Sequence, residues 1–183
     1  MSHPVSEILM HREVEYVFSS DSPLFVPATI GLRPTGFTTA CWSGWHPTYE
    51  ISQGRLYLRD LTIHTAIENL PVICRVAPKQ SYEGCGYYEK LFLPLGHTGE
   101  VTLTAHYPGR WGIAVVPETE RIPSFGLTFH VGQLTAVQNM TFIRKTDPAL
   151  EWPDCVIRIL VAEDDPTPFD DEVAALPESL IPS

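Results

Sequence analysis

Proline and glycine punctuate this chain at short intervals, and their spacing restricts the fold more than any other feature of the sequence. The 183 residues include 17 prolines and 12 glycines, which leave little room for long helices. Both residue types are disfavoured inside helices and central strands, and both are common in turns. The sequence therefore predicts an all-β fold, an antiparallel β-sandwich or barrel of about ten short strands with short peripheral helices.

The clearest strand patterns lie in the second half of the chain. Apolar and polar residues alternate over residues 100–106 with the period of two that a half-buried strand requires. Residues 125–131 alternate in the same way, and Gly132-Gln133 supplies a tight turn into a strand over residues 134–143. These two strands are expected to form a hairpin.

A second hairpin is predicted from residues 48–51 and 55–63, joined by the turn Ser52-Gln53-Gly54. The apolar side chains of its later strand change phase near Arg59-Asp60. A slip of one residue sends side chains to the other face of a sheet, so this change predicts a β-bulge. Further strands are expected at residues 13–18, 25–32, 37–42, 72–76, 91–93, 113–116 and 155–161. Short helices are expected at residues 6–12, 66–70 and 170–176.

The length of the chain fits one domain, and the composition changes only near its end. We expect a β-rich domain over residues 1–162 and an acidic C-terminal tail outside the core over residues 163–183. The tail contains no Lys or Arg and carries Glu163, Asp164, Asp165, Asp170, Asp171, Glu172 and Glu178. If the tail is ordered, it must dock through apolar anchors, and the candidates are Phe169, Val173, Leu176, Leu180 and Ile181.

The formal net charge of −10 bears on the partner. Nucleic-acid binding needs clustered positive charge, and the 12 basic residues are scattered, so nucleic acid is excluded as a direct partner. A basic protein is easier to accommodate. No apolar run is long enough to cross a membrane and the N-terminus lacks a signal peptide, so a cytoplasmic location is expected.

The densest group of reactive side chains lies between residues 38 and 51. A nucleophilic hypothesis has Cys41 activated by His46, with Glu50 orienting the imidazole ring. The alternative is a structural motif of buried cysteine and aromatic residues, which is the usual environment of a free thiol. We expect the structural alternative and no catalytic residue.

No metal site and no cofactor are expected. The histidines and cysteines do not stand at the short spacings typical of zinc ligands, although a barrel can gather ligands from distant strands. Phosphate-loop, dinucleotide-binding and hydrolase motifs are missing from the sequence. The residues considered as ligands were His46, His64, Cys74, Cys85, His97, His106 and His130.

Aromatic residues beside turns are the candidate contact residues, because exposed rings anchor many protein interfaces. Each of them could instead fill the core. The predicted binding residues are these aromatics and the tail acids, namely Trp45, Tyr88, Trp111, Asp164, Asp165, Asp170 and Asp171.

Residues 39–61 also contain a local motif. Ala40-Cys41-Trp42 is followed by Glu50-Ile51 and then by Arg55-Leu56-Tyr57-Leu58, with an acid at Asp60. This segment resembles a pattern in a set of uncharacterised bacterial proteins, which have Arg, Tyr and Trp where this chain has Ser43, Trp45 and Tyr49. The resemblance implies a small bacterial β-rich protein and brings no activity with it.

These observations favour a noncatalytic protein-binding module, of which an immunity or inhibitor-type accessory factor is one form. A β-barrel or sandwich that binds a small ligand is the alternative. A thiol-dependent or metal-dependent enzyme is the third hypothesis, and the sequence carries no positive signal for it.

Overall fold

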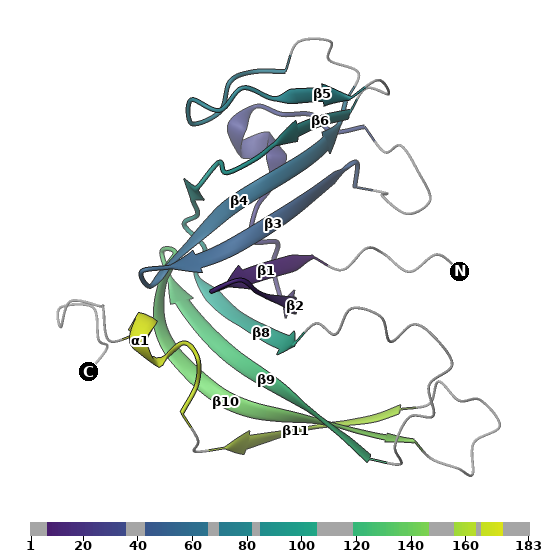
Figure 1. The fold of residues 1–183 in the computed structure, drawn as a ribbon, viewed down its shortest axis with the longest axis vertical. Coiled ribbons are helices and arrows are strands. Elements are labelled where there is room, and N and C mark those ends of the chain that lie inside the picture. The colour runs from purple at the N-terminus through teal and green to yellow at the C-terminus, as the bar shows by residue number, and fades with distance from the viewer. Residues whose placement is uncertain are drawn as a thin grey trace.

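The computed structural model of the chain describes residues 7–35, 43–65, 70–81, 85–105, 119–146, 156–163 and 166–173. Strands dominate this part of the chain, so the predicted all-β class is confirmed (Figure 1). In chain order the elements are β1 (Ile8–His11), β2 (Val14–Ser20), η1 (Pro27–Ile30), β3 (Trp45–Ser52), β4 (Arg55–His64), β5 (Lys79–Ser81), β6 (Cys85–Tyr88), β7 (Leu93–Pro94), β8 (Gly99–Ala105), β9 (Thr119–His130), β10 (Gln133–Thr146), β11 (Val156–Glu163) and α1 (Asp170–Val173).

The sheet closes into a barrel. Its strand order is β11-β10-β9-β8-β2-β1-β3-β4-β6-β5, and β7 pairs with β4. Because β10 pairs with β4 as well as with β9, the seven strands from β10 round to β4 form a closed ring. Among the described strands, β1 and β3 run parallel and every other pair is antiparallel. Of the two architectures that the sequence allowed, the barrel is the one formed.

The closing seam is short and depends on a glycine. The amide of Leu56 donates to the carbonyl of Gly132 over 2.9 Å, and the amide of Leu134 donates to the carbonyl of Gly54 over 2.8 Å. Gly132 has a φ of +77°, and a Cβ at this position would overlap the carbonyl oxygen of Leu95. A side chain here would displace the Leu95 segment, whose amide donates to the carbonyl of Leu56 on β4, so Gly132 permits this close approach at the seam.

The predicted β9–β10 hairpin is confirmed, but its turn lies one residue earlier than expected. His130 pairs with Gln133, so the two turn residues are Val131 and Gly132. Both have left-handed backbone angles, with φ of 49° and 77°, as a type I′ turn requires. The sequence indicated Gly132 correctly, but valine is a rare residue in this conformation and gave no turn signal.

The predicted β3–β4 hairpin and its bulge are also confirmed. Thr48 pairs with Asp60 and Tyr49 pairs with Leu58, so Arg59 has no opposite residue in this pair of strands. Leu58 and Leu61 are both fully buried although three positions separate them. The bulge therefore restores the inward direction of the apolar side chains in the second half of β4.

Three predicted elements are wrong. The helix expected at residues 6–12 is β1, because the segment pairs with β2 on one side and with β3 on the other. The strand expected at residues 25–32 contains the 3-10 helix η1, because Pro27 fixes its first residue and Gly31 ends it in a left-handed conformation. Residues 72–76 form a reversal closed by one bridge between Ile73 and Val76.

Several predictions lie wholly or largely outside the described residues. They are the strands at residues 37–42 and 113–116, the helix at residues 66–70, and the tail anchors Leu176, Leu180 and Ile181.

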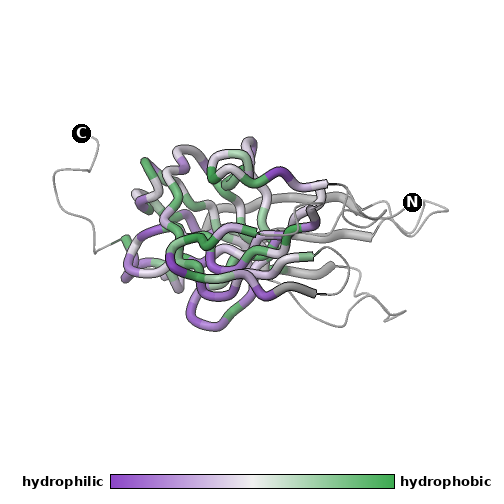
Figure 2. Tube along the Cα trace, turned by 90° about the horizontal axis from the view of Figure 1, so that it is seen from above, coloured by the Kyte–Doolittle hydropathy of each residue, from purple (hydrophilic) through white to green (hydrophobic). Residues whose placement is uncertain are grey.

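Apolar side chains from around the ring fill the barrel. Along the chain, short hydrophobic and hydrophilic stretches alternate (Figure 2), as expected for strands with one face in the core and one face outside. The largest fully buried side chains are Tyr49, Tyr88, Phe129, Phe169, Leu9, Leu32, Leu56, Leu58, Leu61, Ile63, Leu103 and Leu127.

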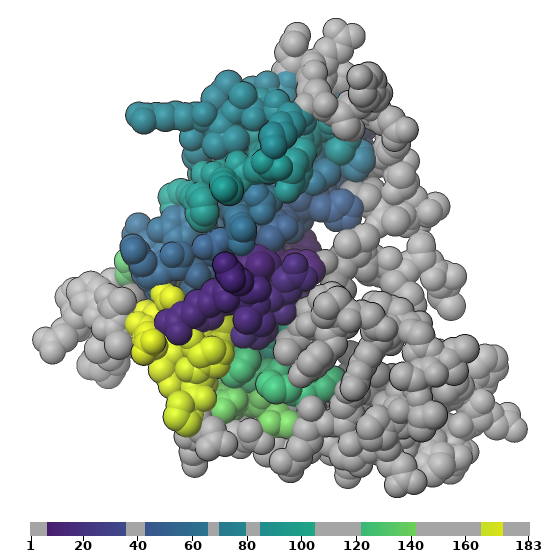
Figure 3. All heavy atoms as spheres, viewed as in Figure 1, coloured from purple at the N-terminus to yellow at the C-terminus, as the bar shows by residue number. Residues whose placement is uncertain are grey.

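The C-terminal segment 166–173 belongs to this core, which corrects the expectation that it lies outside. Figure 3 shows the segment seated against β1 and the β3–β4 turn. Phe169 is fully buried, with its ring stacked on His11 at a centroid distance of 4.3 Å and packed against Tyr16 and Phe125. Phe169 and the half-buried Val173 thus act as anchors, as predicted for an ordered tail.

In the described ranges, none of the helices has the length and apolar character needed to span a membrane.

The closing seam predicts a difference between two glycines with the same backbone conformation. Gly31 also has a φ of +77°, but nothing lies within 4 Å of its missing Cβ. In Gly31→Ala the only penalty should come from placing an alanine in the left-handed conformation. We expect this to lower the free energy of unfolding by about 1–2 kcal/mol. Gly132→Ala must also displace the Leu95 carbonyl, so we expect a loss of at least about 3 kcal/mol. Urea denaturation of both variants measures the difference, and equal losses would show that the seam tolerates a side chain.

Candidate binding surface on the outer face of β4

The bulge in β4 places two consecutive charged residues on the outside of the barrel. The Arg59 guanidinium lies 3.3 Å from a carboxylate oxygen of Glu50 on β3 and 3.4 Å from one of Asp60. All three side chains are partly exposed, so these ion pairs contribute little to stability. Their effect is to hold the three charged side chains together as a platform on the outer face.

The segment between β6 and β7 is fastened to this platform by its backbone. The amide of Leu91 donates to the Arg59 carbonyl over 2.7 Å, and the amide of Lys90 donates to the Asp60 carboxylate over 2.9 Å. Leu91 is buried, while Lys90 and Phe92 on either side of it have φ of 54° and 45°. This left-handed geometry is rare for such residues and is found mainly where the surroundings enforce it.

Phe92 is presented to solvent by this arrangement. The residue is 45% exposed, and its ring meets the ring of Tyr57 edge to face, with centroids 6.4 Å apart. Tyr87 on β6 is also exposed, and the Asp60 carboxylate lies close enough to contribute to its raised pKa, after the larger effect of desolvation. We call the surface made by Glu50, Tyr57, Arg59, Asp60 and Phe92 the bulge face. An aromatic pair beside an arginine is the composition of many interface hot spots.

The structure separates two of the three proposed catalytic residues. His46 and Glu50 point outward from the uninterrupted strand β3, four residues and about 13 Å apart along it. Glu50 is paired with Arg59 instead. Burial, and then the nearby His64, lower the pKa of His46. Glu50 therefore does not orient the His46 ring, and that part of the hypothesis is wrong; Cys41 lies outside the described residues.

The predicted aromatic contacts are distributed differently from expectation. Tyr88 is fully buried, and its hydroxyl donates to the carbonyl of Pro71 over 2.8 Å, so it cannot present its ring to a partner. Trp45 is half-buried and packs edge to face on Phe25 at 5.6 Å. Trp111 lies outside the described residues.

The acidic residues of the C-terminal segment have two roles. Glu172 points inward, where its carboxylate lies 3.3 Å from Nε2 of His11 and accepts the amide of Gly54 over 2.5 Å. Asp170 and Asp171 remain on the surface, and Asp171 pairs there with Arg12 at 3.1 Å. Hydrogen bonds from Thr167, first from its hydroxyl and then from its backbone, lower the pKa of Asp170. Asp164 and Asp165 lie outside the described residues.

Among the histidine, cysteine and acidic residues of the described segments, no three are placed to share a metal ion. Of the residues first considered as ligands, His97 is buried against Phe129, Cys74 is exposed and Cys85 is partly buried.

Phe92 and Tyr57 are the candidate contact residues that the sequence did not indicate. Phe92 stands between two leucines in an apolar run, which is typical of a buried strand. The sequence signal that could have pointed to this surface was the bulge predicted at Arg59-Asp60. A bulge interrupts strand pairing and leaves backbone groups to which a neighbouring segment can hydrogen-bond.

No family model matches the sequence, and no curated protein or solved structure is significantly similar to it.

The His11–Glu172 contact predicts a pH dependence of stability. Burial lowers the pKa of His11 below 6.5, and this effect outweighs the opposite influence of Glu172 and Glu50 and adds to that of Arg12. The unfolded chain then binds more protons than the folded one, so the free energy of unfolding should fall as the pH drops below about 6.5.

His11→Asn should flatten this dependence in urea denaturation series between about pH 5 and pH 7.5. His130, which is exposed at the end of β9, gives the control His130→Asn. An unchanged slope in the His11 variant would contradict the burial of a neutral imidazole beneath Phe169.

Proposed function

We propose that the protein is a noncatalytic protein-binding module of the cytoplasm that holds a basic partner protein through the bulge face. The observation that carries this proposal is the exposure of Phe92. Its segment is fixed by two backbone hydrogen bonds to β4, and both Lys90 and Phe92 have left-handed backbone angles. Backbone strain of this kind costs about 1–3 kcal/mol per residue and clusters at functional positions.

Charge supports a basic partner. The chain carries a net charge of −10, and Asp170 and Asp171 lie on the α1 segment that contacts the β3–β4 turn through Glu172. Opposite charges on two proteins accelerate their encounter and favour the correct orientation. The aromatic pair then supplies the desolvated centre of the interface, and Glu50 and Asp60 supply acids at its rim.

The local motif supports the same surface. Its residues Glu50, Tyr57 and Asp60 all lie on the bulge face, whereas its leucines Leu56 and Leu58 are buried. The resemblance to bacterial proteins thus includes outward-facing side chains that the core does not need. The form of module that we propose is an immunity or inhibitor-type factor.

The test is affinity capture from a lysate of the organism that encodes the chain, followed by calorimetry with the purified partner. Phe92→Asp should reduce binding at least about tenfold, because truncating a hot-spot aromatic costs about 2 kcal/mol or more. Aspartate tolerates the left-handed backbone better than phenylalanine, so the variant should fold. Association should also weaken as ionic strength rises.

Val72→Asp is the matched control, because Val72 is an apolar residue that is 63% exposed and lies outside the bulge face. It should bind the partner as the unaltered chain does. A partner without net positive charge, or equal loss of binding in the two variants, would refute the proposal.

A further inference from the structure

The C-terminal segment 166–173, which we call the strap, lies on the end of the barrel and is held there mainly by side chains. Phe169 is the one residue of the strap that is fully buried. The amides of Glu172 and Val173 both donate to the carbonyl of Phe169. Among the described residues, no hydrogen bond between backbone groups joins the strap to the sheet. The strap can therefore leave the barrel without breaking a strand pairing, as a segment that opens locally must do.

The seat of the Phe169 ring contains a titratable side chain. His11 is 1% exposed, and its imidazole stacks on the Phe169 ring with centroids 4.3 Å apart. Tyr16 and Phe125 complete the seat, with ring centroids 5.6 Å and 5.4 Å from that of Phe169. Lifting the strap would remove both the Phe169 ring and the Glu172 carboxylate from His11. The imidazole would then meet water.

Charged groups approach His11 from three elements. The Glu172 carboxylate of α1 lies 3.3 Å from its Nε2, and Glu50 of β3 also favours the charged imidazole. The neighbouring Arg12 opposes the charged form. Burial has the largest effect, so the pKa of His11 lies below 6.5 in the closed protein. Tyr16 of β2 stays uncharged in this range, because burial raises its pKa from 10.

Exposure to water removes the penalty that burial places on a charged imidazole. We propose that the strap is an acid-sensitive cover, which lifts from the end of the barrel as His11 takes up a proton while the strands stay paired. The free energy of opening should fall as the pH drops below about 6.5, because the open form binds the proton more tightly than the closed form. This device is separate from the bulge face.

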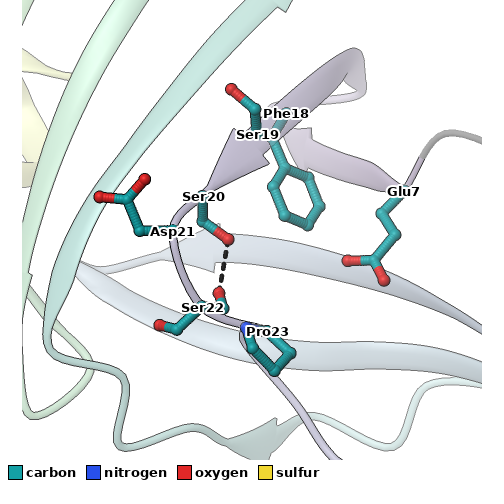
Figure 4. A pocket seen from close by; sticks show the side chains of 7 residues that line it. All are labelled: Glu7, Phe18, Ser19, Ser20, Asp21, Ser22 and Pro23. Carbon is teal, nitrogen blue, oxygen red and sulfur yellow. Dashed lines mark hydrogen bonds between the residues drawn. The ribbon is translucent and has the colours of Figure 1, made fainter.

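The other end of β1 responds to acid in the opposite direction. There Glu7 borders a hollow of about 340 Å³ beside Phe18 (Figure 4). Burial raises the pKa of Glu7, and the nearby Tyr49 hydroxyl partly offsets this effect. Burial, and then Glu7, raise the pKa of Tyr49. A carboxyl with a raised pKa holds its proton better in the folded chain, so acid does not loosen this end of the strand.

The experiment is amide hydrogen exchange of the full chain by NMR at about pH 7.5 and about pH 5.5, with each rate divided by that of the unfolded amide. The Gly54 amide, which donates to the Glu172 carboxylate, reports the strap together with the Glu172 amide. The Leu56 amide, which donates to the Gly132 carbonyl, reports the closed barrel.

We expect the strap amides to be less protected than the Leu56 amide at both pH values. Their protection should fall at least about threefold on acidification. Their exchange should not respond to dilute urea, because local opening exposes little surface, whereas the exchange of Leu56 should respond.

Three variants identify the group that titrates. His11→Asn keeps an N–H donor for Glu172 but does not titrate, so strap protection should be equal at both pH values. His130→Asn is the matched control, because His130 is exposed at the end of β9, and it should keep the acid response. Glu172→Gln removes a charge that favours protonated His11, so the acid response should become larger. Phe92→Asp should leave the strap unchanged, so this proposal and the proposed function can fail independently.

Three results would overturn the proposal. Protection of the strap that rises on acidification would show that Glu172 holds a charged imidazole in place. Strap amides with the protection and the urea dependence of Leu56 would show that the strap opens only when the barrel unfolds. An acid response that persists in the His11 variant would belong to another group.

Discussion

The fold depends on the contact between the β9–β10 turn and the β3–β4 turn. Gly132 takes part on two sides, since its carbonyl accepts the amide of Leu56 and its amide donates to the carbonyl of His97 over 2.7 Å. The first of these bonds, together with the bond from the Leu134 amide to the Gly54 carbonyl, joins β4 to β10 and so closes the ring, while the second ties the turn to the segment before β8. They also make the inner face of the sheet continuous. The core relies on this closure, because apolar side chains from around the ring fill it.

The two ends of β1 have different environments. At its last residue, His11, the barrel is covered by Phe169 and by the Glu172 carboxylate, which also holds the β3–β4 turn through Gly54. Before its first residue, Glu7 borders an open hollow. About 13 Å of strand separates these two positions. A single short strand therefore contributes to the closure of one end of the barrel and lies beside an open hollow near the other.

The outer face of β4 shows how a local irregularity creates a surface. The bulge leaves the Arg59 carbonyl free to accept the amide of Leu91, and this bond positions Phe92 above Tyr57. A regular strand would have continued its pairing with β3 and offered no such anchor. The same residue, Arg59, also projects outward beside Asp60. Stability of the core and display of the aromatic pair thus follow from one backbone feature.

Regular alternation was the part of the structure that could be predicted locally. The strands over residues 100–106 and 125–131, and the bulge near Arg59, were recognised because a half-buried strand imposes a period of two on its own side chains. The 3-10 helix η1 and the reversal at Ile73 were missed, since apolar residues near a proline or a turn carry no such period. Segment β1 was misjudged as helix, because four residues are too few for either pattern to decide.

The sequence by itself determined the strand-rich class, the positions of the long hairpins and the phase change in β4, because these follow from contacts between near neighbours and from the chemistry of single residues. Only the tertiary structure decided that the sheet closes, that Phe169 enters the core, and that Glu7 meets Tyr49 while Phe92 is exposed. Each of these depends on residues far apart in the chain. Their pairing is set by the geometry of barrel closure, which no local pattern encodes.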